Sequence, residues 1–326
     1  MKLNRLQQIL IGLLIVQIAL GAALLWPRQA AAESTPLMGD VTLDSITDVT
    51  VADADGKTLS FHKTDTGWVM PDFASYPAKE SEITKTLEEL LDTTTARLVT
   101  KTATSHRSLK VAEDAFERKL TIKTTDGSTY EVLVGTLAST AANHVRLLPG
   151  DEVYLSSGLA YYRIYTTLSS WADTAYVSAE STDVTSLSLE NPNGIFKFER
   201  FDEVTWKMDG VPSDREFNQN NLTALVSRLA SLRLEEPVAL LKDDKPEYGL
   251  DNPQCVVNAI TSGDNPRTIT ITIGAMTDDE KFYYASSNES EYIVKVTKLN
   301  AETFLNKTLE DFLVQPTPVP TSTTQP

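Results

Sequence analysis

Cysteine and positive charge are both scarce in this sequence of 326 residues. Its one cysteine, Cys255, excludes an internal disulfide framework and a zinc site built from cysteines alone. Lysine and arginine number 29 against 45 aspartates and glutamates, so the formal net charge is −16. Because phosphate binding needs a basic surface, this charge argues against nucleic acid as a partner and against broad contact with anionic lipid headgroups.

The sequence also lacks the short motifs that carry common chemistries. It contains no glycine-rich phosphate loop, no G-x-S-x-G elbow and no H-E-x-x-H helix. Its three histidines, His62, His106 and His144, do not have the spacing of zinc ligands. We therefore predict no catalytic, cofactor-binding or metal-binding residues, no cofactor and no enzymatic activity. A pair of carboxylates for glycoside hydrolysis stays a less favoured alternative, because its spacing is spatial and not sequential.

Three acidic motifs are interpreted as turns or loops. Asp53-Ala54-Asp55-Gly56 resembles the start of a calcium loop, but Lys57 follows at once and a strand resumes. Asn191-Pro192-Asn193-Gly194 occupies the same place later in the chain without the acids, which favours a hairpin turn. Asp278-Asp279-Glu280 and Asp243-Asp244 are predicted to be solvated loops, with weak binding of a divalent cation as the alternative.

Four aromatic residues gather before residue 172, namely Tyr161, Tyr162, Tyr165 and Trp171. Their spacing predicts a helix over residues 159–171 with most of them on one stripe and Tyr161 stacked on Tyr165. Such a stripe serves either internal packing, which we favour, or contact with a partner.

The N-terminus predicts a membrane anchor. Lys2 and Arg5 precede a run from Ile9 to Trp26 that is apolar except for Gln17. Eighteen helical residues span about 27 Å, close to the thickness of the hydrocarbon core. The preceding charges favour a cytoplasmic N-terminus, so the rest of the chain would lie outside the cytoplasm. A signal peptide cleaved after Ala32 is the alternative, since Ala30-Ala31-Ala32 fits a cleavage site.

Apolar residues make up 41% of the chain, enough for a folded core, and their pattern occurs twice. Residues 46–70 match 184–208 with one single-residue gap, which places Trp68 opposite Trp206 and Phe61 opposite Phe198 across the gap. The further matches are 82–91 with 220–230 (both of helical spacing), 116–135 with 255–274, 152–155 with 291–294, and 159–171 with 299–312. Turn pairs coincide at Asp126-Gly127 and Asn265-Pro266, as do the closing glycines Gly135 and Gly274.

This duplication predicts an α+β fold of two tandem, similar units, each an antiparallel sheet with helices on one face. The predicted parts are a membrane anchor over 1–26, a linker over 27–40, a first unit over 41–176 and a second over 177–314. Residues 315–326 contain only Gln, Pro, Thr, Val and Ser and are predicted to be a disordered tail.

Several of these segments are similar to the bacterial family called domain of unknown function 4340 (DUF4340). They are the N-terminal span, ITDVTV (46–51), the spacing from Phe61 to Trp68, YGLDNP (248–253) and TITITIG (268–274). The resemblance implies a membrane-anchored extracytoplasmic protein associated with ABC-type transport systems, including those linked to gliding motility. It implies no catalytic residues. In the first unit, residues 108–111 stand in place of the Tyr-Gly-Leu-Asp sequence of 248–251. The sequence therefore predicts a tight turn at 248–251 and does not decide whether 108–111 forms one.

Together these observations predict a non-enzymatic accessory or scaffold module in the cell membrane, with one pass and an ectodomain outside the cytoplasm. Its partners would be membrane lipid, through the N-terminal helix, and integral-membrane transporter subunits. The alternative is an extracytoplasmic protein that binds a glycan or a peptide in a cleft between the two units.

Overall fold

The computed structural model describes residues 34–140, 142–156, 158–202, 204–262 and 266–315, together with Leu14 and Gln17. The chain forms two compact units. The first contains the residues up to Thr58 and Thr84–Thr166, and the second contains Leu59–Ile83 and the residues from Thr167 onward. The predicted domain boundaries stay predictions.

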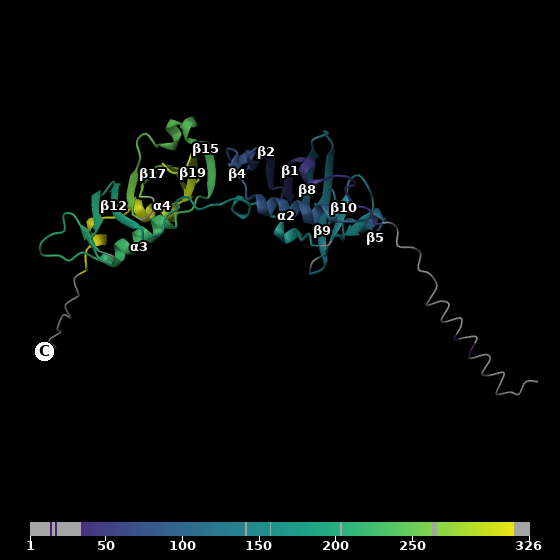
Figure 1. Ribbon diagram of the computed structural model, residues 1–326, viewed down its shortest axis with the longest axis horizontal. Helices are drawn as coiled ribbons and strands as arrows, with labels where there is room; N and C mark the ends of the chain where they lie inside the picture. Colours follow the sequence, from purple (N-terminus) through teal and green to yellow (C-terminus); the bar gives the residue numbers. More distant parts are fainter. Residues whose placement is uncertain are drawn as a thin grey trace, which may run out of the picture. The chain divides into compact units, whose positions relative to one another are not determined.

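A sheet of nine strands has the order β4-β3-β2-β1-β8-β9-β10-β11-β5 (Figure 1). Its printed strand pairs are all antiparallel, and Val51 on β1 lies opposite Leu120 on β8. The strands are β1 (Ile46–Asp53), β2 (Thr58–Thr64), β3 (Gly67–Met70), β4 (Tyr76–Pro77), β5 (Leu98–Thr100), β8 (Arg118–Thr124), β9 (Thr129–Ser139), β10 (Ala142–Leu147) and β11 (Val153–Leu155). A separate two-stranded ribbon joins β6 (Val111–Ala112) and β7 (Ala115–Phe116).

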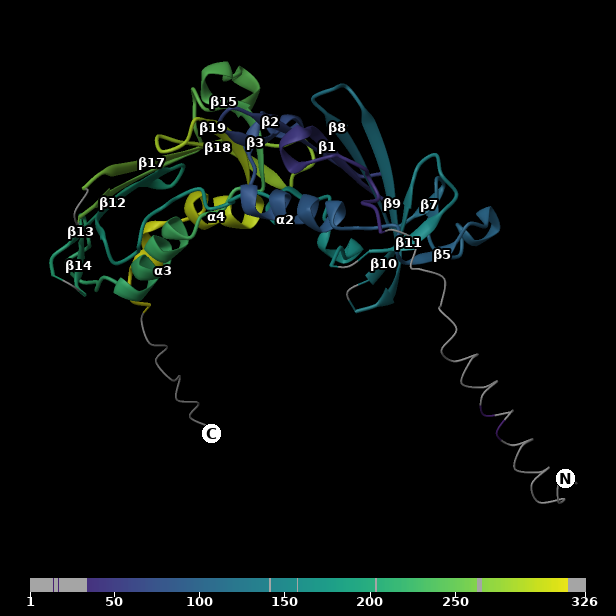
Figure 2. The same cartoon turned by 45° about the vertical axis from the view of Figure 1, so that its right-hand side comes forward.

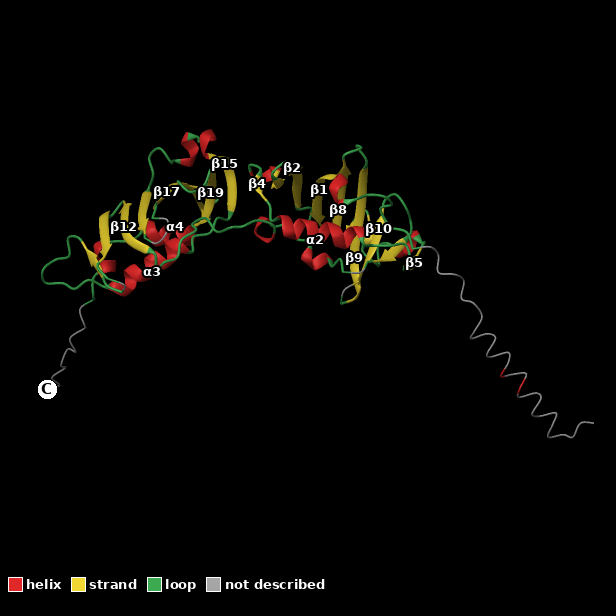
Figure 3. Ribbon diagram, in the orientation of Figure 1, coloured by secondary structure: helices red, strands yellow, loops and turns green. Residues whose placement is uncertain are grey.

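A second sheet of eight strands has the order β14-β13-β12-β16-β17-β18-β19-β15 and is also antiparallel. Its strands are β12 (Val184–Asn191), β13 (Gly194–Arg200), β14 (Trp206–Met208), β15 (Glu236–Leu240), β16 (Cys255–Thr261), β17 (Thr268–Met276), β18 (Phe282–Ser287) and β19 (Tyr292–Thr297). The helices α3 (Gln219–Ala230) and α4 (Lys298–Leu305) lie together on one face of this sheet (Figures 2 and 3).

The two sheets share one strand order. In spatial order, the strands of the first sheet that have a counterpart are β3, β2, β1, β8, β9, β10, β11 and β5. Their counterparts in the second sheet are, in the same order, β14, β13, β12, β16, β17, β18, β19 and β15. The first sheet has one additional strand, β4. The strands β1 and β12 have the same length and bury the same positions along it, since both alternate apolar side chains toward the core. The α+β class and the antiparallel sheets are therefore confirmed.

Residues that were matched in the sequence have the same surroundings. Trp68 and Trp206 are both buried. Phe61 packs edge-to-face on Trp171 with ring centroids 5.1 Å apart, and Phe198 packs on Phe312 in the same way at 4.8 Å. Such aromatic pairs add to the area that each ring buries and fix the segment after the sheet against it.

The matched glycines do not close their strands as expected, because β9 and β17 continue past Gly135 and Gly274. A Cβ atom on Gly135 would collide with the carbonyl oxygen of Leu109, and one on Gly274 with that of Tyr248. The turn that crosses each glycine contains a residue with positive φ, Lys110 at 58° and Gly249 at 66°. The tight turn is therefore present in both sheets, with lysine where the second has glycine.

The helix α2 (Glu80–Leu91) confirms the helical spacing of 82–91 and buries Ile83, Leu87 and Leu90, whereas Leu91 is only partly buried. The helix predicted over 159–171 is wrong. Two 3-10 turns, Tyr161–Arg163 and Leu168–Ser170, take its place. The carbonyl oxygen of Ile164 accepts a hydrogen bond from Arg118 Nε at 2.5 Å, so contacts with the sheet override the helical spacing.

The remaining turns are short 3-10 segments, at Leu43–Ser45, Pro71–Phe73, Ala103–Ser105, Leu241–Asp243, Pro246–Tyr248 and Leu309–Phe312. No helix within the described ranges is long and apolar enough to cross a membrane. The predicted anchor at 9–26 and most of the predicted tail fall outside these ranges.

Candidate functional site

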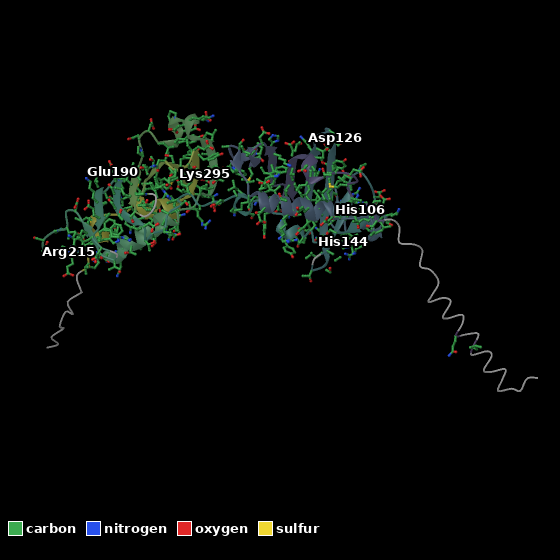
Figure 4. All side chains as sticks on the ribbon, in the orientation of Figure 1. His106, Asp126, His144, Glu190, Arg215 and Lys295 are labelled. Atoms are coloured by element: carbon green, nitrogen blue, oxygen red, sulfur yellow. The ribbon has the colours of Figure 1, made fainter. Side chains whose placement is uncertain are left out.

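Two of the three histidines contact backbone carbonyl groups. His106 is buried, and its Nε2 atom lies 2.8 Å from the carbonyl oxygen of Asp151. His144 Nδ1 lies 2.9 Å from the carbonyl oxygen of Thr136. His62 is exposed on β2, on the face opposite Phe61 as the alternation predicted. Figure 4 labels His106 and His144 in the first unit.

The acidic motifs form turns, as predicted for Asp53–Gly56. Asp53 Oδ1 accepts hydrogen bonds from the backbone N–H of Asp55 (3.0 Å) and Lys57 (2.9 Å), and Oδ2 accepts one from the Thr166 hydroxyl (2.7 Å). Burial raises the pKa of Asp53, but the hydrogen bonds from Thr166 and the turn outweigh it and lower the pKa. Asp279 likewise accepts hydrogen bonds from Thr277 Oγ1 (2.7 Å) and from a backbone N–H group.

The tyrosines before residue 172 do not form the expected stripe. Tyr161 makes an edge-to-face contact with its neighbour Tyr162 at 5.9 Å, where a stack on Tyr165 was predicted. Tyr162 and Tyr165 are each 45% exposed, whereas Trp171 is buried. The cluster is therefore divided between core and surface.

The turn between β13 and β14 exposes large apolar side chains, and we call its described residues, Phe201, Asp202, Val204 and Thr205, the apolar turn. Phe201 is 68% exposed and Val204 is 80% exposed. The inward positions on β13, Phe196 and Phe198, are buried, so Phe201 lies past the point where the alternation can bury an aromatic ring. Exposed apolar side chains of this size, when grouped, mark surfaces that contact a protein, a membrane or a ligand.

Hydrogen bonds fix the shape of the apolar turn. The backbone N–H of Phe201 donates to the carbonyl oxygen of Thr205 at 2.8 Å. Asp202 Oδ1 accepts from the backbone N–H groups of Val204 (3.0 Å) and Thr205 (2.7 Å). These bonds hold the pKa of the Asp202 carboxyl below its usual value, so it stays ionised as an acceptor. The turn therefore displays its apolar side chains in a fixed geometry.

A pocket of about 300 Å³ adjoins the apolar turn. The guanidinium of Arg200 stacks on the Trp206 ring, 4.8 Å from its centroid. Arg200 also donates to the carbonyl oxygens of Thr182 (2.5 Å) and Ser181 (3.2 Å). The lining consists of Ser181, Thr182, Arg200, Val204, Trp206, Thr223 and Val226. The contacts of Arg200 thus hold the floor of the pocket, and Val204 forms part of the lining.

The first sheet has a matching cation and ring but not the apolar turn. Lys63 Nζ lies 6.0 Å from the centroid of Trp68, at the positions that correspond to Arg200 and Trp206. The turn that follows is polar, with Thr64 Oγ1 3.1 Å from Thr66 Oγ1. Since the fold forms with a polar turn here, Phe201 and Val204 are not needed to build the hairpin.

Two other cavities are lined in part by charged side chains. One of about 570 Å³ is lined by Ser178, Glu180, Asp183, Ser262 and Arg267 among others, and Arg267 forms an ion pair with Glu289. The other, of about 410 Å³, lies in the first unit and is lined by Lys85, Glu89, Thr140, Gly158, Ala160, Tyr162 and Arg163. There Arg163 Nη2 lies 2.8 Å from a Glu89 carboxylate oxygen.

Sequence reasoning did not single out the apolar turn. The signal was available, because Phe201 breaks the inward register of Phe196 and Phe198, and the matched segment at 64–67 has no apolar residue. None of the described residues forms a group of three or more metal-ligating side chains.

Comparisons with known proteins bear on the family alone. No curated protein and no solved structure matches the chain. The family described as Domain of unknown function (DUF4340) matches residues 68–253 and 211–316. These matches span most of both sheets and include Trp206 and the apolar turn. The chain therefore belongs to the DUF4340 family.

Proposed function

We propose that this protein is a non-enzymatic accessory or scaffold module, held in the cell membrane by residues 9–26 with its folded part outside the cytoplasm. Its partner in this proposal is an integral-membrane subunit of an ABC-type transport complex. The observation that carries the proposal is the apolar turn, where Phe201 and Val204 are displayed beside a preformed pocket.

The design of the apolar turn favours binding of a protein. The ammonium of Lys207 lies 3.9 Å from the centroid of the Phe201 ring, and most of the Phe201 side chain is still exposed. Aromatic side chains at the centre of an interface contribute much of its binding energy. The hydrogen bonds of Asp202 fix the turn before a partner arrives, so little conformational entropy is lost on association.

Three carboxyl groups in turns are unsuited to general acid catalysis. A general acid needs a raised pKa near the working pH. Hydrogen bonds from turn residues lower the pKa of Asp126, Asp202 and Asp279, whose main donors are Thr124, Val204 and Thr277. These carboxylates act as acceptors that close turns.

Photocrosslinking on native membranes tests the proposal. A photoreactive phenylalanine analogue at position 201 should crosslink to an integral-membrane transporter subunit, identified by mass spectrometry. The double variant Phe201→Ser/Val204→Ser should lower co-purification of that subunit at least tenfold. Its melting temperature should not change, because both side chains are mostly exposed.

Ile195 provides the matched control. It is 60% exposed on the outer face of β13, so a photoreactive group at that position lies on the same hairpin but outside the apolar turn. It should give no crosslink to the subunit, and Ile195→Ser should leave co-purification unchanged. Equal recovery with the double variant, or a partner that is not a membrane protein, would refute the proposal.

A second candidate function is the binding of a glycan, favoured by the cavity of about 410 Å³ in the first unit. Tyr162 offers a ring for stacking, and Lys85, Glu89 and Arg163 offer donors and acceptors for hydroxyl groups. A glycan array should then detect a ligand that binds wild type and the Tyr165→Ala control but not Tyr162→Ala. Binding that survives Tyr162→Ala would exclude this cavity.

A further inference from the structure

The strand β5 is the last strand of the nine-stranded sheet (Figures 1 and 2). Leu98 and Val99 on this strand are 45% and 42% exposed. Arg97 precedes them and Lys101 follows them, and both are exposed. We call these four residues the β5 patch. It combines two adjacent apolar side chains with two flanking cations.

The corresponding strand of the second sheet, β15, has a covered edge. The 3-10 turn Pro71–Phe73 lies against it. Pro237 on β15 is buried, and Glu236 forms an ion pair with Lys295 at 2.9 Å. Cover, proline and paired charge are the usual means of protecting a sheet edge. Since β15 occupies the same place in the strand order, the fold does not require the exposure of Leu98 and Val99.

The β5 patch lies beside the point where the chain enters the first unit. Pro36 bridges Thr94 in antiparallel pairing. The backbone N–H of Thr95 donates to the carbonyl oxygen of Thr35 at 2.9 Å, and that of Leu37 donates to the carbonyl oxygen of Thr93 at 2.8 Å. From residue 26, the last of the apolar run, to residue 34 there are only eight residue steps, which reach at most about 29 Å. A membrane anchor at 9–26 would hold the patch near the bilayer surface.

The segment that contains the β5 patch has a charge opposite to that of the whole chain. Residues 93–112 contain no aspartate or glutamate and four lysines or arginines, although the net charge of the protein is −16. Within the described part of the chain, Arg97 and Lys110 form no ion pair, whereas Lys101 lies 3.5 Å from Glu152 and Arg107 pairs with Asp114. At physiological ionic strength, charges act over about 8 Å, so distant carboxylates are screened from this surface.

We propose that the β5 patch lies on the membrane surface, where Arg97 and Lys101 bind anionic lipid headgroups and Leu98 and Val99 enter the interfacial region. A lipid surface fits this combination because basic side chains bind its phosphates while short apolar side chains bury below them. This inference rests on the membrane anchor in the proposed function.

Fluorescence of the full chain in liposomes tests the proposal. Burial raises the pKa of the Cys255 thiol to about 12, so Leu98→Cys provides a single reactive site for a polarity-sensitive label. The emission maximum of the label should shift to shorter wavelength on vesicles with 30% phosphatidylglycerol. The shift should be smaller on pure phosphatidylcholine and should disappear at 1 M salt. Arg97→Gln and Lys101→Gln should each lower the ratio of docked to undocked molecules by about fivefold.

A label at Thr125→Cys is the matched control in the same unit. Thr125 is exposed in the turn after β8, four strands from β5 and so about 19 Å across the sheet. Figure 4 shows Asp126 in this turn well away from His106, which follows the β5 patch in the chain. The Thr125 label should show no shift on either lipid.

Flotation of the same vesicles separates the two ways of failing. If the chain floats and the Leu98 label responds equally to neutral and anionic lipid, or not at all, the β5 patch does not bind headgroups and the anchor stands. If the chain does not float, both the anchor and the patch are refuted. Flotation with a salt-sensitive shift confined to Leu98 on anionic vesicles supports both.

Discussion

Asn191→Asp should be the most damaging single-atom change in the second sheet. Asn191 is 8% exposed at the end of β12. Its Oδ1 accepts from the backbone N–H of Asn193 at 2.8 Å, and its Nδ2 donates to the carbonyl oxygens of Phe304 (2.8 Å) and Lys307 (2.9 Å). The side chain thus ties the β12–β13 turn to the end of α4. Aspartate keeps the acceptor but replaces the donor by a charged oxygen that faces two carbonyl oxygens.

The cost follows from the bonds that change. Two hydrogen bonds are lost, each worth about 0.5–1.5 kcal/mol, because the Lys307 carbonyl keeps Asn193 Nδ2 as a donor (3.2 Å) and the Phe304 carbonyl keeps the backbone N–H of Lys307 (3.4 Å). Repulsion from the buried carboxylate adds to this loss. We expect the free energy of unfolding to fall by about 4 kcal/mol at pH 7. In the first sheet, Asp53 occupies the matching position, and Asp53→Asn should cost about 1 kcal/mol or less, because the amide can donate to the Thr166 hydroxyl.

The loss caused by Asn191→Asp should depend on pH. The folded state disfavours the charged form, so the pKa of the introduced carboxyl should lie above the ordinary value of about 3.9. The penalty is then smallest below that ordinary value, where the carboxyl is neutral in both states. It grows as the pH rises through the ordinary pKa and is complete above the raised one.

Urea unfolding of the full chain in detergent measures both variants. Tryptophan fluorescence at pH 4 and pH 7 should be compared with wild type at the same pH, and hydrogen exchange of β12 should localise the effect. If Asn191→Asp costs no more than Asp53→Asn, or if its cost increases as the pH falls, the account of Asn191 as a donor to two carbonyl groups is wrong.

Three further predictions follow from the turns and glycines. Gly274→Ala should lower the free energy of unfolding by about 3 kcal/mol, since its methyl group meets a backbone oxygen that cannot retreat, whereas Gly150→Ala should cost less in the same urea titration. Lys110→Gly should raise it by about 0.5 kcal/mol, because φ is 58° there, and a lower melting temperature would contradict this. Asp53→Ala should cost about 3 kcal/mol at pH 7. Because the pKa of Asp53 is lowered, this contribution is present above about pH 3.9 and is lost as the pH falls through the lowered value, so the variant should lose less stability in acid titration.

Local pattern accounted for the elements that alternate strictly. The run from Ile46 to Asp53 could only bury its apolar residues as a strand, and its match at 184–191 had the same pattern, so both strands and both tryptophans were predicted correctly. The same reasoning failed over 159–171. There the helical spacing competes with bonds from distant residues, such as Arg118 to the Ile164 carbonyl and Thr166 to Asp53.

Spacing gave a signal for Phe201, which breaks the inward register of Phe196 and Phe198, but none for the β5 patch. Val204, Leu98 and Val99 are apolar residues of the kind that a pattern assigns to a core, and only the fold shows that they are exposed. Their exposure depends on which strand ends a sheet and which segment covers it. The edge of β15 is covered by residues 71–73, which lie far from it in the sequence.

The amino-acid order alone was enough to predict the α+β class, the two matched halves and the hairpin turns, because each depends on the period of apolar residues or on short turn chemistry. The family was recognised from the resemblance of particular segments, such as YGLDNP (248–253). Tertiary structure decided the strand order, the crossing of a tight turn over Gly135 and Gly274, and the surfaces left open to water. These features arise from contacts between residues far apart in the chain. No local pattern encodes which distant segment will cover a given edge.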